Sequence, residues 1–381
     1  MLTVPLKVVQ AQGVLLKKDV STNLWRVWNR AGEMVTGDEL ACPEPFEATL
    51  EDAAKELRIT LLGDTRLEWL APAGEARVQM QLDRGRVVFV WQAGNDQSPV
   101  VIRIGKSAFR LEPQEAGGTC GVEVIGRGPV GFERQPPPPG VLAVLHVAAA
   151  RIRVVPDQGE PVTVSSGARW PLIGPLTEDE LVSPSGAWLD PSQRTTVFPL
   201  RRFASRFEKL FDPQISAEQA LAPLYRDPHP ILAELATRGL ALLDQTDDLV
   251  QALAESSHVE VRRAAVHGLR QWLARTTDGG QSVLAALLRR YPTEQDARLV
   301  YRLLWGLSLT DGQDSMLSQG LVELLTDNRV EIRELAFEQM VKLTGRRYDY
   351  QPLASPSSRL AGQQRWRQHL EREGGALVRP R

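Results

Sequence analysis

Cysteine is the residue that the sequence uses least, with two in 381 residues, Cys42 and Cys120. They stand far apart and in no metal-ligand spacing, which excludes a zinc finger and a disulfide framework. Whether the two pair with each other stays open. So few cysteines suit an oxidising compartment as well as a reducing one, and they assign no location.

Long hydrophobic runs are also missing. The longest apolar stretch, 141–150, is about half of the ~20 residues that a membrane-spanning helix needs, and His146 interrupts it. The first twenty residues alternate like a strand and lack the unbroken apolar core of a secretory signal. The sequence therefore predicts a soluble chain without an export signal.

An excess of charge of one sign is absent too. The chain has 45 Lys and Arg against 47 Asp and Glu, a formal net charge of −2. Up to residue 200 the numbers are 20 against 24, and after it 25 against 23. This balance argues against nucleic acid as a partner, because phosphate binding needs a concentrated basic surface. The doublets Arg262-Arg263, Arg289-Arg290 and Arg346-Arg347 are interpreted as solvated helix faces and helix ends.

Catalytic motifs do not occur. There is no Walker loop, GxSxG elbow or dinucleotide-binding GxGxxG, and the glycine-rich segment 126–131 leads into proline instead of a helix. His258 and His267 flank one helical segment, but a spacing of nine does not place both imidazoles on one face. The other histidines are scattered: His146, His229 and His369. The sequence predicts no catalytic, cofactor-binding or metal-ligating residue, no small-molecule substrate and no enzyme.

Short apolar runs bounded by turn residues fill the chain from residue 4 to about 170, which is the pattern of an all-β region. Leu67 and Trp69 alternate with charged residues, as expected for a strand that shows one face to a core. The clearest strands are 57–62, 65–70, 77–82, 86–91, 100–105, 108–113, 121–126, 141–147, 151–156 and 161–166.

Residues that favour chain reversal stand between these runs, for example at 62–64 and 83–85. Segment 47–57 has the composition of a short helix and would be the one interruption. We therefore predict an all-β domain over residues 1–170, with a sandwich or jelly-roll-like fold or an irregular barrel.

The periodicity fades between 171 and 213, where proline spaces out Gly, Ser and Thr, and this indicates a proline-rich linker. Trp188, Phe203 and Phe207 are expected to attach the linker to one of the domains. A separate run, Pro136–Pro139, is interpreted as a stiff surface connection, with a ligand for an aromatic-lined groove as the alternative.

Helical spacing begins at about residue 214. Apolar residues recur at intervals of three and four, as in the stripe of Ile332, Leu335 and Leu343. Residues that can accept a hydrogen bond from a helix start precede these segments: Ser216, Asp227, Ser257 and Asp327. The sequence predicts an α-helical domain over 214–381, and so an α+β protein with segregated domains.

One helical unit is repeated. Segment 259–273 matches 330–344 at most of its apolar positions, 71 residues apart, about twice the period of a two-helix repeat. Segment 297–307 lies between them as a divergent copy, and 230–243 is a weaker copy 29 residues before the first. Since one helix pair cannot bury its own apolar face, the copies are expected to stack.

The repeated pattern Val-x-Val/Ile-Arg-x-x-Ala, preceded by Asp or Ser, resembles HEAT repeats. In that family the arginine commonly ties successive repeats together, which implies a structural role for Arg262 and Arg333. The small Ala265 and Ala336 are predicted to be structural as well, because they let neighbouring helices approach closely. The resemblance implies a helical solenoid over 214–381.

The β region resembles a FecR-type domain. The resemblance rests on GEMVTGDEL (32–40), LDRGRVVFV (82–90) and RIRVVPDQGEPVTVSSGARW (151–170), the last similar to a closing hairpin. With its HEAT-like tail, the chain is similar to bacterial envelope-associated proteins that join these two parts. Members of that group generally carry an N-terminal membrane anchor, which this sequence does not show.

These features predict a non-catalytic scaffold whose helical array binds a protein partner. Trp272, Trp305 and Trp366 are candidate contacts, because large aromatics often anchor interfaces, with core packing as the alternative. The FecR resemblance implies a second hypothesis, an envelope signal sensor or transducer held at the membrane only through an anchor outside this chain. It also favours the periplasm or cell envelope, whereas Met1 as the true start favours the cytoplasm.

Overall fold

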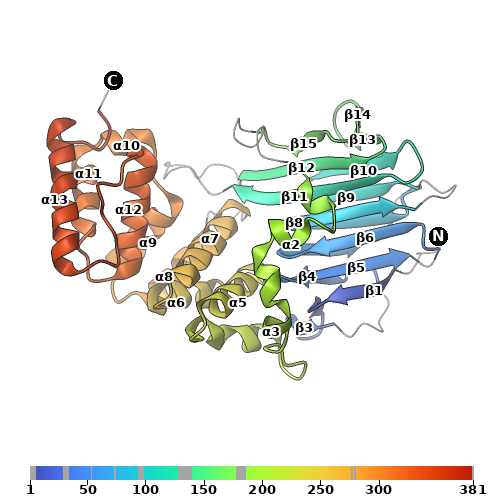
Figure 1. The fold of residues 1–381 in the computed structure, drawn as a ribbon, viewed down its shortest axis with the longest axis horizontal. Coiled ribbons are helices and arrows are strands. Elements are labelled where there is room, and N and C mark those ends of the chain that lie inside the picture. The colour runs from blue at the N-terminus through green and yellow to red at the C-terminus, as the bar shows by residue number, and fades with distance from the viewer. Residues whose placement is uncertain are drawn as a thin grey trace. The chain divides into compact units, whose positions relative to one another are not determined.

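The computed structural model describes residues 6–28, 34–52, 54–72, 74–92, 98–127, 140–176, 186–275, 278 and 280–379. A region of strands precedes a region of helices (Figure 1), which confirms the predicted α+β class with segregated domains. The proline run 136–139 lies outside the described residues, as does most of the glycine-rich segment 126–131.

The strands form two sheets that share one long strand, β8. Sheet 1 has the order β1 (Leu6–Gln12), β5 (Glu47–Asp52), β6 (Leu57–Leu62), β8 (Val78–Trp91), β11 (Thr119–Arg127), β12 (Gly140–Ala149) and β15 (Arg169–Ile173). Sheet 2 has the order β3 (Leu24–Val27), β2 (Leu16–Asp19), β4 (Glu39–Cys42), β7 (Thr65–Leu70), β8, β9 (Val100–Ile104), β10 (Ser107–Pro113), β13 (Ile152–Pro156) and β14 (Val162–Val164).

Strand β8 passes from sheet 2 to sheet 1 at Gly85. Its first half pairs with β7 and β9, and its second half pairs with β6 and β11. The register with β7 shifts at this point, because Leu67 faces Leu82 while Arg66 faces Arg84, so Asp83 is an extra residue. A bulge of this kind bends a strand and increases its twist, which lets one strand serve both sheets.

The reversal predicted at 83–85 is therefore wrong, since the chain bends there without turning back. The short helix considered for 47–57 is wrong as well: this segment begins with β5. Its residues alternate between buried and half-buried, so burial of Ala48 and Leu50 in the core outweighs the helical composition. Asp52 then ends the strand by accepting hydrogen bonds from the backbone N–H groups of Glu56 and Leu57, at 2.8 and 3.2 Å.

Of the segment expected to be a linker, 171–213, the described residues from 186 onward begin with a helix that lies against sheet 1 (Figure 1). Trp188 and Leu189 pack on Leu62 and Val88, and a side chain at Gly121 would collide with the Trp188 ring. The helices of this segment are η1 (Ala187–Leu189), α2 (Arg194–Val197), η2 (Pro199–Phe203) and α3 (Ala204–Glu208). Trp188, Leu189 and Phe207 are buried, so the segment contributes side chains to the core and is not a free connection.

Contacts divide the chain into two compact units, and the division falls after Gln245, not at the predicted position before residue 214. The sheet unit contains the strands and the helices up to α5, and the helical unit contains the helices from Thr246 onward. The first predicted repeat helices belong to the sheet unit: α4 (Ala217–Leu221), η3 (Ala222–Arg226) and α5 (Pro230–Leu242).

Polar contacts explain this division. The Trp25 backbone N–H donates to buried Glu218 at 3.0 Å, and the buried Arg84 guanidinium donates to the Ala241 carbonyl at 3.2 Å. Arg66 forms an ion pair with Asp244. A buried polar group needs a partner, so these contacts fix α4 and α5 on the sheet. Such pairings between distant residues leave no periodic signal in the sequence.

The helical unit contains paired helices joined by short loops. Its elements are α6 (Thr246–Glu255), α7 (Val259–Arg275), α8 (Gln281–Arg290), α9 (Glu294–Trp305), α10 (Leu309–Gln313), α11 (Ser315–Leu324), α12 (Val330–Thr344) and α13 (Pro356–Arg372). α6 packs on α7, α8 on α9 and α11 on α12, while α9 also contacts both α7 and α12. Among the described helices, none has the length and apolar composition needed to cross a membrane.

The two cysteines are free thiols inside the sheet unit, on β4 and β11. Burial raises the pKa of both thiols well above the usual range, so they stay protonated at neutral pH. They behave as small apolar residues of the core.

We predict that Gly85→Ala lowers the melting temperature of the sheet unit strongly. A β-carbon at Gly85 would lie 2.4 Å from Thr65, and the backbone φ of +95° is unfavourable for other residues. Gly105→Ala is the matched control, since its φ is also positive, at +59°, but nothing lies within 4 Å. We expect Gly85→Ala to lose about 2 kcal/mol more stability than the control. Equal losses would show that the close approach at the bend is unimportant.

Candidate functional site

Three helices begin with the same turn, which supports the equivalence of the repeats. Three residues before the start of α5, α7 and α12, the side chains of Asp227, Ser256 and Asp327 each accept a hydrogen bond from a backbone N–H two residues later. The distances are 2.7, 3.2 and 2.8 Å. The acceptor before α7 is Ser256, not Ser257 as predicted.

Arg262 joins the two stronger copies of the repeat. Its side chain is 1% exposed and donates to both carboxylate oxygens of Glu334 on α12, at 2.7 and 2.6 Å. It also donates to the Ser256 carbonyl in the loop before its own helix, at 2.7 Å. A planar guanidinium suits this double contact, because it can bind a carboxylate with two parallel hydrogen bonds and still reach a third acceptor.

Arg333 makes the equivalent contact to its preceding loop in the second of the two stronger copies. It donates to the Asp327 carbonyl at 2.7 Å, six residues before it, as Arg262 does to Ser256. It also donates to the Asn328 carbonyl of the same loop, at 3.0 Å, and forward to the Pro352 carbonyl, at 2.9 Å. Each arginine thus links the loop before its helix to a later segment of the unit.

The alanines of the repeat lie in the helix contacts. Ala265 and Ala336 are fully buried, on α7 and α12. From the same two helices, Arg270 and Gln339 donate to the Leu303 carbonyl in the last turn of α9, at 3.4 and 3.3 Å. The last turn of α9 is therefore hydrogen-bonded to both α7 and α12.

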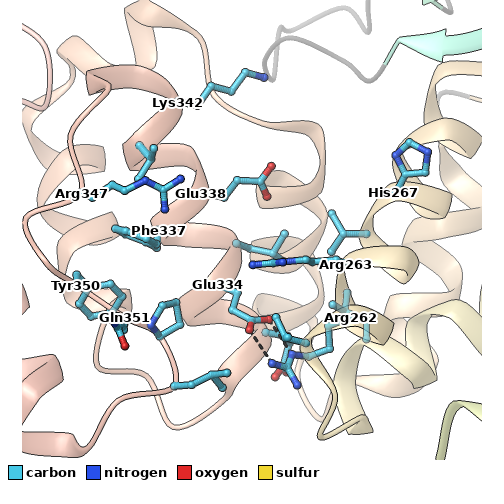
Figure 2. Close-up of a pocket in the computed structure, with 18 of the residues that line it drawn as sticks. Arg262, Arg263, His267, Glu334, Phe337, Glu338, Lys342, Arg347, Tyr350 and Gln351 are labelled. Atoms are coloured by element: carbon cyan, nitrogen blue, oxygen red, sulfur yellow. Dashed lines mark hydrogen bonds and ion pairs between the residues drawn. The ribbon is translucent and has the colours of Figure 1, made fainter. Parts of the chain in front are cut away.

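A groove of about 720 Å³ lies between α7, α12 and the loop after α12 (Figure 2). Its α7 wall is one helical face, with residues at intervals of three and four: Val259, Arg262, Arg263, Val266, His267 and Arg270. The α12 wall carries Glu331, Glu334, Leu335, Phe337, Glu338, Val341 and Lys342. Leu253 and the loop residues Arg347, Tyr350, Gln351, Pro352 and Leu353 complete the lining.

Three cations in the groove are exposed and have no ion-pair partner within the described part of the chain: Arg263, Lys342 and Arg347. Figure 2 shows Arg263 reaching in from α7 and Arg347 from the loop on the opposite side. Arg262 and Arg270 are paired, with Glu334 and Glu338. The groove therefore presents positive charge that the fold does not neutralise.

The acidic side chains of the groove are occupied. Glu334 and Glu338 bind arginines, and buried Glu331 accepts a hydrogen bond from the Tyr291 hydroxyl at 3.3 Å. Burial raises the pKa of Glu331 above its ordinary value. Burial also raises the pKa of Tyr350 to about 12, so this phenol is neutral and donates to the Leu325 carbonyl.

The three tryptophans proposed as contacts lie outside this groove. Trp366 is fully buried, and the centroid of its ring lies 4.8 Å from that of Tyr348. Trp305 is 5% exposed. These positions favour core packing over partner contact. Trp272 is half-buried, and its indole N–H donates to the Ser282 hydroxyl at 2.7 Å.

Three of the groove's cations belong to basic doublets for which the sequence predicts solvated helix faces and helix ends. Arg262 and Arg263 differ in the structure, since one is buried and paired while the other is exposed. Arg347 belongs to the doublet Arg346-Arg347. The helical interval between Arg263, Val266 and Arg270 could have indicated a shared face, but nothing in the sequence places the 347–353 loop opposite that face.

Within the described residues, no group of three or more His, Cys, Asp or Glu side chains is arranged to hold a metal ion. The histidines belong to different elements: His146 lies on β12, His229 precedes α5, and His369 lies on α13. His258 precedes α7, and His267 lies on that helix, where its ring is hydrogen-bonded to the Gln271 side chain. Comparison with models of protein families finds no matching family, and comparison with curated proteins finds no similar protein.

We predict that Arg262→Ala destabilises the helical unit by about 3 kcal/mol, because it leaves Glu334 without its buried partner. Arg289→Ala is the control, since Arg289 pairs with Asp247 on the surface, and we expect it to lose less than about 1 kcal/mol. Urea unfolding followed by circular dichroism measures both. Similar losses for the two variants would contradict a special role for Arg262.

We predict that Glu331→Gln stabilises the protein at pH 7. A carboxyl whose folded pKa is raised weakens the fold as pH rises above its unfolded value of about 4.3, because the buried form must ionise. Glutamine removes that charge and can still accept the Tyr291 hydrogen bond. The increase in melting temperature should shrink as pH is lowered and vanish below about pH 4. Exposed Glu294→Gln is the control, and a gain that does not depend on pH would contradict this account.

Proposed function

We propose that the chain is a non-catalytic scaffold whose helical unit binds a protein partner in the groove between α7 and α12. One observation carries this proposal: the groove combines exposed cations with half-buried aliphatic side chains, among them Val259, Val266 and Val341. Interfaces typically combine an apolar centre with a polar rim in this way. A groove along a helix face also suits an extended or helical segment better than a compact small molecule.

The HEAT resemblance supports the same proposal. Stacked helix pairs create an extended concave surface, and repeat proteins use such surfaces for binding. The equivalent contacts of Arg262 and Arg333 are what the resemblance implies for a repeat array. These contacts make the groove walls rigid, so a partner would meet a preformed surface.

A second proposal rests on the resemblance of the sheet unit to FecR domains. In that role the sheet unit would receive an envelope signal, and a membrane anchor would lie outside this chain. The two proposals differ in where the protein is found: cell fractionation that places the native protein in the envelope favours the transducer, and recovery from the cytoplasm favours the scaffold.

We predict that a photo-crosslinking amino acid placed at Val266 in the full chain captures a protein partner in the cells that make it. Val266 lies in the groove wall, so a bound partner would be within reach. Leu288 is the control position, because it is exposed on α8 and does not line the groove. Adducts are detected by gel shift and identified by mass spectrometry. The absence of an adduct at Val266, or the same adducts from both positions, would argue against the groove as a binding site.

A further inference from the structure

We infer that the groove recognises an acidic segment of its partner that also carries apolar side chains. This inference rests on the proposed function and adds the chemistry of the bound segment. It follows from two features of the groove, the charge left over after its internal ion pairs are made and the aliphatic surface between those charges.

The groove carries more cationic than anionic side chains. Five cations and three carboxylates line the groove. Arg262 and Arg270 are used by Glu334 and Glu338, and the third carboxyl group, Glu331, is buried and accepts a hydrogen bond from Tyr291. The exposed charge that remains comes from Arg263, Lys342 and Arg347. Carboxylates of a bound segment would complement these cations, with arginine able to form paired hydrogen bonds.

The three cations come from three different segments of the helical unit. Arg263 belongs to α7, Lys342 to α12 and Arg347 to the loop after it, so the groove brings together residues more than 70 positions apart in the chain. Figure 2 shows Arg263 and Arg347 on opposite sides and Lys342 at one end. A segment lying in the groove could contact all three, which gives directional recognition as well as attraction.

Apolar contacts supply the second requirement. Val266 and Val341 are half-buried in the walls, and Leu353 on the rim is 59% exposed. An exposed leucine in the same groove as two half-buried valines would gain from being covered, whereas a purely charged ligand would leave it in water. The segment should therefore alternate carboxylates with apolar residues.

Nucleic acid fits this groove less well. Glu334 and Glu338 lie in its wall, and each would face phosphates if the groove held a nucleic acid. The chain as a whole has a net charge of −2, which gives no long-range attraction for a polyanion. A short segment with a few carboxylates placed opposite the three cations meets less of this repulsion than a nucleic acid, which carries a phosphate at every nucleotide.

The size of the groove sets the length of the segment. The groove lining on α7 runs from Val259 to Arg270, a distance of about 17 Å at 1.5 Å per residue. An extended peptide covers that distance with about five residues, at roughly 3.3 Å each. A probe of about ten residues is therefore long enough to contact the whole wall.

The test uses labelled peptides of this length with the full chain, and fluorescence anisotropy measures binding. The first peptide alternates glutamate with leucine. In the second, glutamine replaces glutamate; in the third, serine replaces leucine; a labelled single-stranded DNA oligonucleotide is the fourth probe. We expect the first peptide to bind with a dissociation constant below about 1 mM, more tightly than the others, and to weaken as salt increases.

Charge reversal locates the binding. The double variant Arg263→Glu with Arg347→Glu should bind the glutamate–leucine peptide roughly tenfold more weakly, because attraction becomes repulsion. The control is Arg289→Glu with Arg298→Glu, which changes the net charge equally at exposed positions on α8 and α9 outside the groove. Lys342→Glu is a further single change. Melting temperatures establish that each variant is folded.

Each outcome decides the inference. Weaker binding by the groove variants and unchanged binding by the control support it. Equal weakening in both double variants, equal affinity for the glutamine peptide, no binding of the first peptide, or tighter binding of DNA would overturn it. A partner captured from Val266 while the acidic peptide fails to bind would leave the proposed function standing and show that the chemistry of the segment is different.

Discussion

The helical unit depends on the burial of one guanidinium. Arg262 is 1% exposed, and removing its charge from water is unfavourable by several kcal/mol unless its N–H groups are satisfied. Glu334 and the Ser256 carbonyl provide that compensation, and they come from α12 and from the loop before α7. The geometry of these hydrogen bonds therefore sets how closely the two repeated helices approach. The groove lies between those helices, so its width follows from the same contacts.

Residues that differ between the two stronger copies determine which side chains line the groove. Positions that hold the array together are the same in both copies, as at Arg262 and Arg333. The neighbouring positions that line the groove differ: Arg263 in one copy corresponds to Glu334 in the other, and Val266 to Phe337. Since Glu334 is taken by the structural arginine, Arg263 is left without a partner among the described residues. A repeated framework with unequal surface positions thus produces a net positive wall without any excess of basic residues in the chain.

Local patterns in the sequence predicted the classes of structure but not the contacts between them. Alternation predicted strands, and the spacing of three and four predicted helices, because both depend on residues close in the chain. The bend at Gly85 was mistaken for a turn, since an isolated glycine after a charged pair fits both. The boundary was placed too early because α5 has the pattern of a repeat helix while Arg84 attaches it to the sheet unit. The groove could not be predicted, because it needs the 347–353 loop opposite α7.

Because β8 belongs to both sheets, it determines how the sheet unit unfolds. Its backbone amides belong to the hydrogen-bond ladders of both sheets, with β7 and β9 on one half and β6 and β11 on the other. Neither sheet can separate from the other without breaking the hydrogen bonds that β8 makes in both. We therefore expect the two sheets to open as one cooperative unit, and the amide protons of β8 to exchange with solvent only when both sheets unfold.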